Sequence, residues 1–577
     1  MSSPGGTVSP MNRRRFMAYF STIGLSATAL PTLLWARAQQ AGKITKAMIA
    51  GAEGVAGLEF TDEERELMVR GLNRNLAAYE QLREVDLPNS VPPALIFDPV
   101  LPGRQLPLEH RPFRLSRRTG VSRPDNLEEV AFWSARDLSE LIRTRQVTSV
   151  ELTKMYLDRL ERYGSKLECV ITLTDDLALR QASNADREIA HGNYRGPLHG
   201  IPWGAKDLLS EDQYRTTWGA KPFEDQVIEA DATVVEKLEA AGAVLVAKLT
   251  LGALAQGDVW FGGRTRNPWK TDQGSSGSSA GPAAATVAGL VGVSIGSETL
   301  GSIVSPSTRC GATGLRPSFG RVSRHGAMAL SWSMDKLGPL CRSVEDCAIV
   351  LDAIHGADGK DPTARTVPFN WSPELEISHL RIGYYKSAFD YEPRNERERR
   401  FSTKNFDVKA LDVLRSLGAS LIPIEVPDEF PTSALRIILS AEAAAAFDQL
   451  TLSGRDDLLV RQGRGAWPNS FRTARAIPAV EYIQANRVRT MLMGAMDAAM
   501  KGVDLFVTPS FGGNVLLTTN LTGHPSVTLP NGFRDDGTPV SISFVGQLFG
   551  EAEMLAVAKK YQDATGFHLQ HPPEFVV

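Results

Sequence analysis

A stretch of small residues in the middle of the chain constrains the fold most. Residues 274–326 combine a Gly/Ser loop, an Ala-rich run of helical character and a second tight turn at Gly301 and Ser302. Serine and threonine stand here where an ordinary core segment carries leucine and isoleucine. Gly/Ser tracts are most often flexible linkers. A linker is not expected here, because an apolar helix and a second turn follow directly.

From residue 126 onwards, helix patterns alternate with strand patterns, which is typical of βα units sharing one sheet. Residues 199–207 indicate a turn leading into a buried strand. The spacing of apolar residues predicts helices at 134–145, 148–163, 231–241 and 551–564, and strands at 243–248, 503–508, 526–529 and 541–545. The two helices at 148 and 231 are expected to start at Thr148, in a capping box with Glu151, and at Asp231.

The N-terminus predicts a signal peptide of the twin-arginine type over residues 1–38. Arginines 13 and 14 precede Phe16, an apolar run spans 18–34, and Ala36-Arg37-Ala38 is an A-x-A cleavage pattern that would leave Gln39 first. The alternative is a membrane anchor, but the run is short and is broken by Ser, Thr, Gly and Pro31. We therefore expect a periplasmic or secreted protein.

Residues 39–125 form a predicted N-terminal extension, helical after a Thr61/Glu64 capping box and then rich in proline. Residues 126–577 form the predicted main domain. The extension is expected to lie along the main domain, and a homodimer contact through it is an open alternative.

Charge and cysteine usage exclude several classes of protein. Removing the four arginines of residues 1–38 from the 63 basic residues leaves 59 against 66 acidic residues, and no basic stripe is present, so nucleic acid is not an expected partner. The four cysteines have no metal-ligand spacing and are expected to be free, mostly buried thiols. The histidines show no ligand pair, so we predict no metal.

Three residues are candidates for chemistry. Lys206 stands in an apolar run, and a lysine acts as a base only where burial lowers its pKa from about 10.4. Ser278 lies in the Gly/Ser loop and Ser302 in the second turn, and a serine hydroxyl needs such a base to become a nucleophile. Gly301 permits a tight turn that aims consecutive N–H groups at one point, as an oxyanion hole requires.

These segments resemble the amidase signature family. The similarity covers about 126–570 and implies one large α/β domain with a central mixed β-sheet flanked by helices. The motifs that carry it are Gly200-Ile201-Pro202, Lys206-Asp207, Asn267-Pro268-Trp269, Gly277-Ser278-Ser279, 283–290, Gly301-Ser302-Ile303, Cys310-Gly311, 314–317, 320–323, 504–509, 523–525 and 539–546.

The resemblance implies a Ser–cis-Ser–Lys triad. Lys206 would be the base, Ser278 the bridging serine after a cis peptide bond, and Ser302 the nucleophile that becomes acylated. The backbone N–H groups of four residues would form the oxyanion hole: Thr299, Leu300, Gly301 and Ser302. No cofactor is implied.

The chain departs from the family pattern around both serines. Leu300 and Ser276 replace glycines, Ala280 replaces a following glycine and Pro282 a serine. Val304 or Ser305 stands where some members carry a substrate-binding arginine. We expect Leu300 to narrow the site and the missing arginine to remove a preference for carboxylate-bearing substrates.

These features predict an exported amidase that hydrolyses a small-molecule carboxamide to an acid plus ammonia or an amine. One alternative is the glutamine-hydrolysing component of a tRNA amidotransferase, against which the signal peptide and the acidic charge argue. The other is a non-catalytic binding protein on the same fold. The expected partners are a small amide and the twin-arginine export machinery.

Overall fold

The computed structural model describes residues 44–85, 88–91, 93–396 and 402–576. The predicted signal peptide lies outside these residues. The chain divides into two compact units, Met1–Pro88 and Asn89–Val577. Residues 89–125, which the sequence predicts as part of the extension, therefore group with the second unit by their contacts.

The first unit contains two helices, α3 (Lys46–Ala56) and α4 (Asp62–Arg83). The predicted capping box starts α4: the Glu64 amide donates to Thr61 Oγ1 at 3.3 Å, and the Thr61 amide donates to Glu64 Oε2 at 2.6 Å. Arg65 on α4 pairs with Glu53 on α3 at 2.8 Å, which ties the two helices together.

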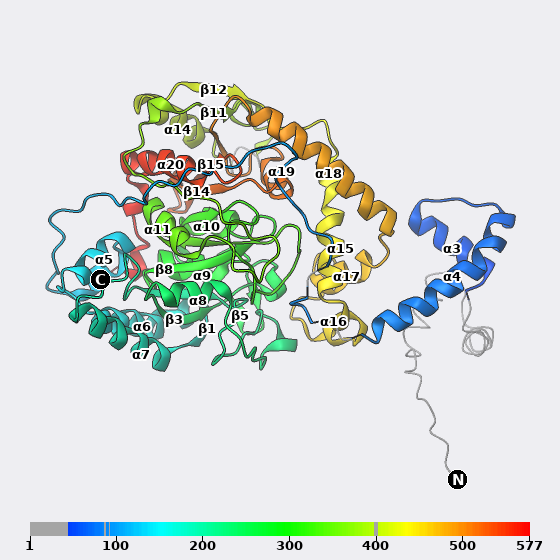
Figure 1. Ribbon diagram of the computed structural model, residues 1–577, viewed down its shortest axis with the longest axis horizontal. Coiled ribbons are helices and arrows are strands. Elements are labelled where there is room, and N and C mark those ends of the chain that lie inside the picture. The colour runs from blue at the N-terminus through cyan, green and yellow to red at the C-terminus, as the bar shows by residue number, and fades with distance from the viewer. Residues whose placement is uncertain (1–43, 86–87, 92, 397–401, 577) are drawn as a thin grey trace, which may run out of the picture. The chain divides into compact units, whose positions relative to one another are not determined.

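The second unit is built on an eleven-stranded mixed sheet, in the order β1-β3-β2-β8-β10-β9-β14-β15-β13-β11-β12 (Figure 1). β2 pairs in parallel with β3 and β8, whereas β8 and β10 are antiparallel, which confirms the predicted mixed α/β sheet. The strands are β1 (Val170–Leu173), β2 (Pro202–Lys206), β3 (Val244–Leu249), β8 (Val293–Glu298), β9 (Thr313–Arg316), β10 (Lys336–Cys341), β11 (Ile382–Tyr385), β12 (Leu421–Ile424), β13 (Leu505–Pro509), β14 (Ser526–Phe533) and β15 (Pro539–Gly546). Two small ribbons pair β4 (Val259–Trp260) with β5 (Gly263–Arg264) and β6 (Arg266–Asn267) with β7 (Lys270–Gly274).

Helices cover the sheet, and most predicted helices are present. They are α5 (Ala135–Arg143), α6 (Ser149–Leu167), α7 (Asp175–Ala190), α8 (Thr233–Ala240), α9 (Ala280–Val287), α10 (Val304–Cys310), α11 (Val344–Ile354), α12 (Lys386–Asp390), α14 (Lys404–Ser416), α15 (Arg436–Ala446), α16 (Asp448–Leu452), α17 (Trp467–Ala474), α18 (Ala479–Met500), α19 (Val515–Thr522) and α20 (Glu551–Thr565). The Thr148/Glu151 capping box of α6 is confirmed. Asp231 does not cap α8, so that prediction is wrong: the N-cap is Ala232, and Asp231 Oδ1 accepts from the Asp212 amide at 2.9 Å instead.

The central strands are buried on both faces. Every residue of β2, β3 and β8 is buried, as expected for strands covered by helices on two sides. Side chains alternate between the faces of a strand, so Trp203 and Lys206 on β2 point to opposite faces. Trp203 faces side chains of α7 and α8, whereas Lys206 faces the loop that leads into α9. The sheet thus separates two distinct side-chain environments on one short strand.

Residues 89–125 lie along the second unit as an irregular segment. Phe97 packs edge-on against Phe319 with ring centroids 5.0 Å apart. The Ser116 amide donates to buried Glu345 at 2.7 Å. The expectation that this part of the extension lies along the main domain is therefore met for residues 89–125.

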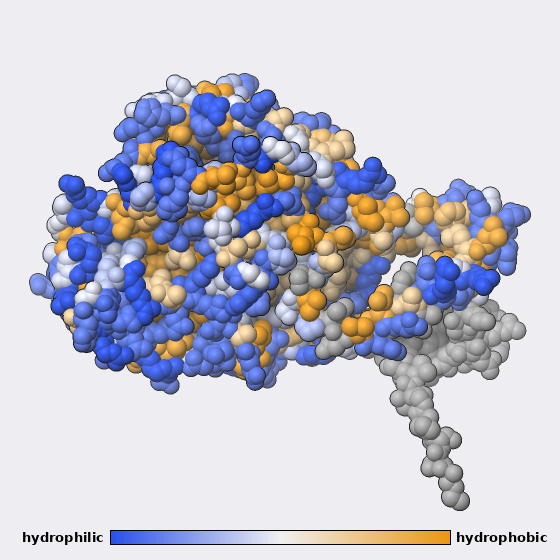
Figure 2. Space-filling view, in the orientation of Figure 1, coloured by the Kyte–Doolittle hydropathy of each residue, from blue (hydrophilic) through white to orange (hydrophobic). Residues whose placement is uncertain are grey.

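The visible face of the protein carries mainly hydrophilic side chains with smaller apolar areas among them (Figure 2). Among the helices that the structure describes, none combines the length and apolarity needed to cross a membrane. All four cysteines are buried and free, as predicted: Cys169, Cys310, Cys341 and Cys347.

Candidate active site

Lys206 is the last residue of β2, and its side-chain nitrogen lies among serine hydroxyls. Lys206 Nζ donates to Ser278 Oγ at 2.8 Å, to Ser297 Oγ at 2.8 Å and, more weakly, to Ser279 Oγ at 3.2 Å. Lys206 is fully buried, and Ser278 is 1% exposed. The structure therefore brings Lys206 and Ser278 together, as expected from the sequence.

The residue after Lys206 fixes the end of the strand. Asp207 forms a fully buried ion pair with Lys248 on the neighbouring strand β3 at 2.9 Å. Its other oxygen, Oδ2, accepts from the Thr217 amide at 2.8 Å and from the Thr217 hydroxyl at 2.5 Å. Breaking a buried ion pair from one side costs about 3–5 kcal/mol, so this anchor holds the Lys206 backbone firmly.

Burial sets the protonation of Lys206. Desolvation lowers its pKa well below the ordinary value, and the negative charges of Asp335 and Glu298 only partly oppose that shift. Its hydrogen-bond partners are hydroxyl groups, which can donate to the lone pair of a neutral amine as well as accept from an ammonium group. The site therefore favours a lysine that can act as a base.

The loop before Ser278 approaches other backbone closely. The Gly277–Ser278 peptide bond is cis. A Cβ on Gly277 would lie 1.9 Å from the carbonyl oxygen of Gly257, so only glycine fits there. Ser276 adopts a φ of 61°, a conformation that favours glycine, and glycine is the residue that the family pattern has near this position. The Ser276 hydroxyl lies 2.8 Å from Ser305 Oγ, so two residues that depart from the family pattern contact each other.

The second turn comprises residues 298–305 and is named here the Ser302 turn. Gly301 has a φ of 85°, which confirms the predicted tight turn. Among the residues that the structure describes, the amides of 299–302 donate to no protein acceptor, whereas the Ile303 and Val304 amides both donate to Glu298 Oε2. The four unused N–H groups are consecutive, an arrangement that suits an oxyanion hole.

Glu298 anchors the Ser302 turn from behind. Besides the two amides, its Oε1 accepts from Arg316 Nη1 at 2.8 Å and from Asn520 Nδ2 at 2.8 Å. Burial alone would raise the pKa of Glu298, but Arg316 and the donated hydrogen bonds together hold it at about 2. Glu298 is therefore ionised, fully buried and bonded at both oxygens.

Asp335 holds the same turn from the other side. The Thr299 hydroxyl donates to Asp335 Oδ1 at 2.5 Å, and the Leu330 and Ser331 amides donate to Oδ2 at 2.8 and 2.9 Å. Burial raises the pKa of Asp335. Leu300, which we expected to narrow the site, packs against an apolar cluster that includes Met334 and Leu435.

Ser302 is joined to the Ser278 loop through the backbone: the Ser279 amide donates to the Ser302 carbonyl at 3.1 Å. In the described part of the chain, the Ser302 hydroxyl has no hydrogen-bond partner.

The sequence analysis missed Ser279 and Ser297. With Ser278 they supply the three hydroxyls around Lys206 Nζ, named here its hydroxyl cage. The clue was present, because Ser297 lies on the strand that leads into the Ser302 turn.

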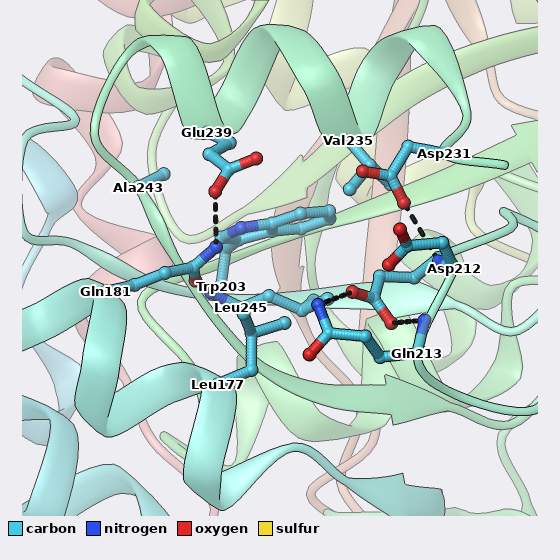
Figure 3. Close-up of a pocket in the computed structure, with 11 residues that line it drawn as sticks. Leu177, Gln181, Trp203, Asp212, Gln213, Asp231, Val235, Glu239, Ala243 and Leu245 are labelled. Atoms are coloured by element: carbon cyan, nitrogen blue, oxygen red, sulfur yellow. Dashed lines mark hydrogen bonds between the residues drawn. The ribbon is translucent and has the colours of Figure 1, made fainter.

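A cavity of about 90 Å³ borders this site at Ser297 and Thr299. A second cavity, of about 190 Å³, lies beside Trp203 on the opposite side of β2 (Figure 3). Three of its carboxylates approach within 4.8 Å of one another: Glu211, Asp212 and Asp231. Glu211 accepts from the Gln213 amide at 3.0 Å, and an acidic cluster without further support does not identify a cation site.

Comparisons with known proteins agree on the family. The model of the amidase family, described as "Amidase", matches residues 151–517. The A component of the glutamyl-tRNA(Gln) amidotransferase of Carboxydothermus hydrogenoformans is 33% identical, over 77% of this chain and 99% of its own length.

Solved structures extend the similarity to the fold. Native peptide amidase from Stenotrophomonas maltophilia is 30% identical with a TM-score of 0.68, covering 78% of this chain and 100% of that one. A bacterial aryl acylamidase of the amidase signature family, 22% identical with a TM-score of 0.66, covers 77% of this chain and 98% of that one, and shares the fold.

Proposed function

Because this chain belongs to the amidase family, we propose that it hydrolyses a carboxamide C–N bond through Lys206, Ser278 and Ser302. The observation that carries the proposal is the buried hydrogen bond of 2.8 Å between Lys206 Nζ and Ser278 Oγ. A lysine in that position has the lowered pKa that a general base needs, and a hydroxyl to pass a proton through.

The proposed chemistry runs in two halves. Ser302 loses its proton to Ser278, whose own proton passes to neutral Lys206, and Ser302 Oγ attacks the amide carbonyl carbon. The carbonyl oxygen turns toward the free amides of residues 299–302. The C–N bond breaks as the proton returns through Ser278 to the leaving nitrogen, and ammonia or an amine departs. Water then attacks the acyl ester by the same relay and releases the acid. The relay requires the Ser302 hydroxyl to donate to Ser278 Oγ.

A second candidate function has direct support from the comparisons. The relative from Carboxydothermus hydrogenoformans is a component of glutamyl-tRNA(Gln) amidotransferase. This similarity supports the amidotransferase function more strongly than it supports the free hydrolysis that the sequence predicts. Such a component would use the same serines and lysine but would hand ammonia to a partner. The similarity to peptide amidase supports free hydrolysis. Assays of the purified chain alone on a panel of amides separate the two, because a component that depends on a partner would be inactive on every amide without it.

The proposed site is tested with a fluorophosphonate probe and peptide mass spectrometry. We expect one adduct, on Ser302, and none after Ser302→Ala. Ser278→Ala should slow labelling strongly but leave the adduct on Ser302, since only the proton path is cut. An adduct on Ser276, Ser278 or Ser279 would contradict the assignment. Labelling without turnover of any amide or ester would instead favour a binding protein.

We also propose that the chain is exported by the twin-arginine route to the periplasm or beyond. The supporting observations are the two arginines at 13 and 14, the apolar run and the A-x-A pattern. The proposed partners are a small amide and the export machinery, with no nucleic acid.

A further inference from the structure

The cavity of about 90 Å³ beside Ser297 and Thr299, named here the side cavity, borders the proposed site at these two residues. Ser297 accepts from Lys206, and Thr299 carries the first of the free amides, so the side cavity adjoins a partner of the base and one end of the free amides. Most of its wall is apolar. The apolar lining residues include Leu208, Ala255, Met328, Leu330, Trp332 and Leu337.

The charged residues that line the side cavity already have partners. Arg324 donates to Asp361 Oδ2 at 2.9 Å, to the Trp332 carbonyl at 2.6 Å and to Thr363 Oγ1 at 2.8 Å. Asp361 is occupied by Arg324 in return.

The other two charges are also engaged. Both oxygens of Asp335 accept from the surrounding protein, one from Thr299 and the other from two backbone amides. Lys360 pairs with Glu236 at 2.7 Å, and His325 is exposed at the rim. Among the described lining residues, Arg324, Lys360 and the two aspartates are therefore already paired, so a charged substrate group that meets them would displace a partner or lose its hydration without compensation.

We infer that the substrate is an uncharged carboxamide whose acyl part is a short branched apolar chain that fills the side cavity. This inference rests on the proposed hydrolysis. Primary amides test it most directly, because their leaving group is ammonia and the acyl chain is the only apolar part that can enter the cavity. An apolar cavity of about 150 Å³ binds benzene, so a smaller one suits a branched aliphatic chain better than a ring.

The same wall disfavours L-glutamine as a substrate. Its ammonium and carboxylate groups would both need partners, and the one arginine that lines the side cavity is held by Asp361. The position where some family members carry a substrate-binding arginine holds Val304 or Ser305 here, and the Ser305 hydroxyl is paired with Ser276.

The test measures kcat/KM of the purified chain for five amides: acetamide, 3-methylbutanamide, benzamide, succinamate and L-glutamine. We expect 3-methylbutanamide to exceed acetamide by at least about tenfold, since one methylene in an apolar pocket gives about 10-fold or more. Succinamate and L-glutamine should fall at least about tenfold below 3-methylbutanamide. Equal or better turnover of either charged amide would overturn the inference while leaving the proposed hydrolysis intact. If no amide is hydrolysed, the proposed function fails and the inference falls with it.

A variant links the preference to the side cavity itself. Ala329 is a half-buried lining residue whose backbone is fixed by Asn89, which accepts from its amide at 2.7 Å and donates to its carbonyl at 2.8 Å. Ala329→Leu fills the space without touching those bonds, so the ratio of 3-methylbutanamide to acetamide should fall at least about fivefold. The matched control Ala190→Leu makes the same change at an exposed residue of α7 and should leave the ratio unchanged. An unchanged ratio in Ala329→Leu would show that the acyl chain binds elsewhere.

Discussion

The anchoring of the Ser302 turn by Glu298 leads to a quantitative prediction for Glu298→Gln. The substitution keeps the shape of the side chain but removes its charge, so Arg316 loses the buried partner that lies 2.8 Å away. A glutamine also has only one acceptor oxygen, so it cannot serve Arg316 and the Ile303 and Val304 amides together. We therefore expect both a loss of stability and a looser turn.

The size of the stability loss follows from the pKa of Glu298. Its value of about 2 in the folded protein, against 4.5 for an ordinary glutamate, corresponds to about 3 kcal/mol at about 1.4 kcal/mol per unit. Because the folded-state pKa is the lower one, this contribution is complete above pH 4.5 and is lost as the pH falls toward 2. The difference between wild type and Glu298→Gln should thus be about 3 kcal/mol at pH 7. Below pH 4.5 it should shrink by about 1.4 kcal/mol per pH unit.

Urea unfolding followed by tryptophan fluorescence at pH 7, 4.5 and 3.5 measures this difference, and fluorophosphonate labelling reports on the turn. Glu551→Gln is a matched control, because Glu551 is equally buried and pairs with Arg321 at 3.4 Å but makes none of the bonds of the Ser302 turn. Both variants should lose stability, whereas only Glu298→Gln should slow labelling of Ser302, by at least about tenfold. The reasoning is refuted if Glu298→Gln is as stable as wild type at pH 7, or if the difference does not change between pH 7 and 3.5.

Three further predictions concern the base, its hydroxyl cage and export. Lys206→Ala should remain folded but lose several orders of magnitude in kcat. Because burial lowers the pKa of Lys206, wild-type activity should rise from acid pH and level off once the amine is neutral; a Lys206→Ala enzyme with near-normal rates would contradict the assignment. Ser297→Ala removes a hydroxyl that accepts from Lys206 at 2.8 Å and should change the midpoint of that pH–rate profile; an identical profile would show that Ser297 does not affect the base. Changing Arg13 and Arg14 together to lysine should retain an uncut precursor in the cytoplasm, as judged by fractionation and N-terminal sequencing, whereas normal release of a chain starting at Gln39 would exclude twin-arginine export.

Sequence patterns predicted the local features that depend on nearby residues. The capping boxes at Thr61 and Thr148, the buried strand ending at Lys206 and the tight turn at Gly301 each follow from a few adjacent side chains. Asp231 failed as a cap, because a short acidic side chain can bond any nearby amide and the Asp212 amide lies within reach.

Contacts between distant segments could not be predicted in this way. The resemblance to the amidase signature family implied that Lys206 meets Ser278, but the spacing of residues did not show that Ser279 and Ser297 join them. The pairing of Thr299 with Asp335 likewise depends on how two loops fold over one sheet. Leu300 shows the same limit, since only the packed structure reveals that its side chain turns toward Met334 and Leu435.

The division of the backbone amides along the Ser302 turn connects stability with the proposed chemistry. In the described part of the chain, the four consecutive amides of 299–302 donate to no protein acceptor, so their N–H groups are available to a substrate oxygen. Glu298 fixes the following backbone by accepting from the next two amides. Arg316 balances the charge of Glu298, so this anchor does not place an uncompensated negative charge behind the turn. An oxyanion at the tetrahedral carbon is a stronger acceptor for the amides of 299–302 than the neutral carbonyl oxygen of the bound amide. These four amides would therefore favour the transition state over the bound amide.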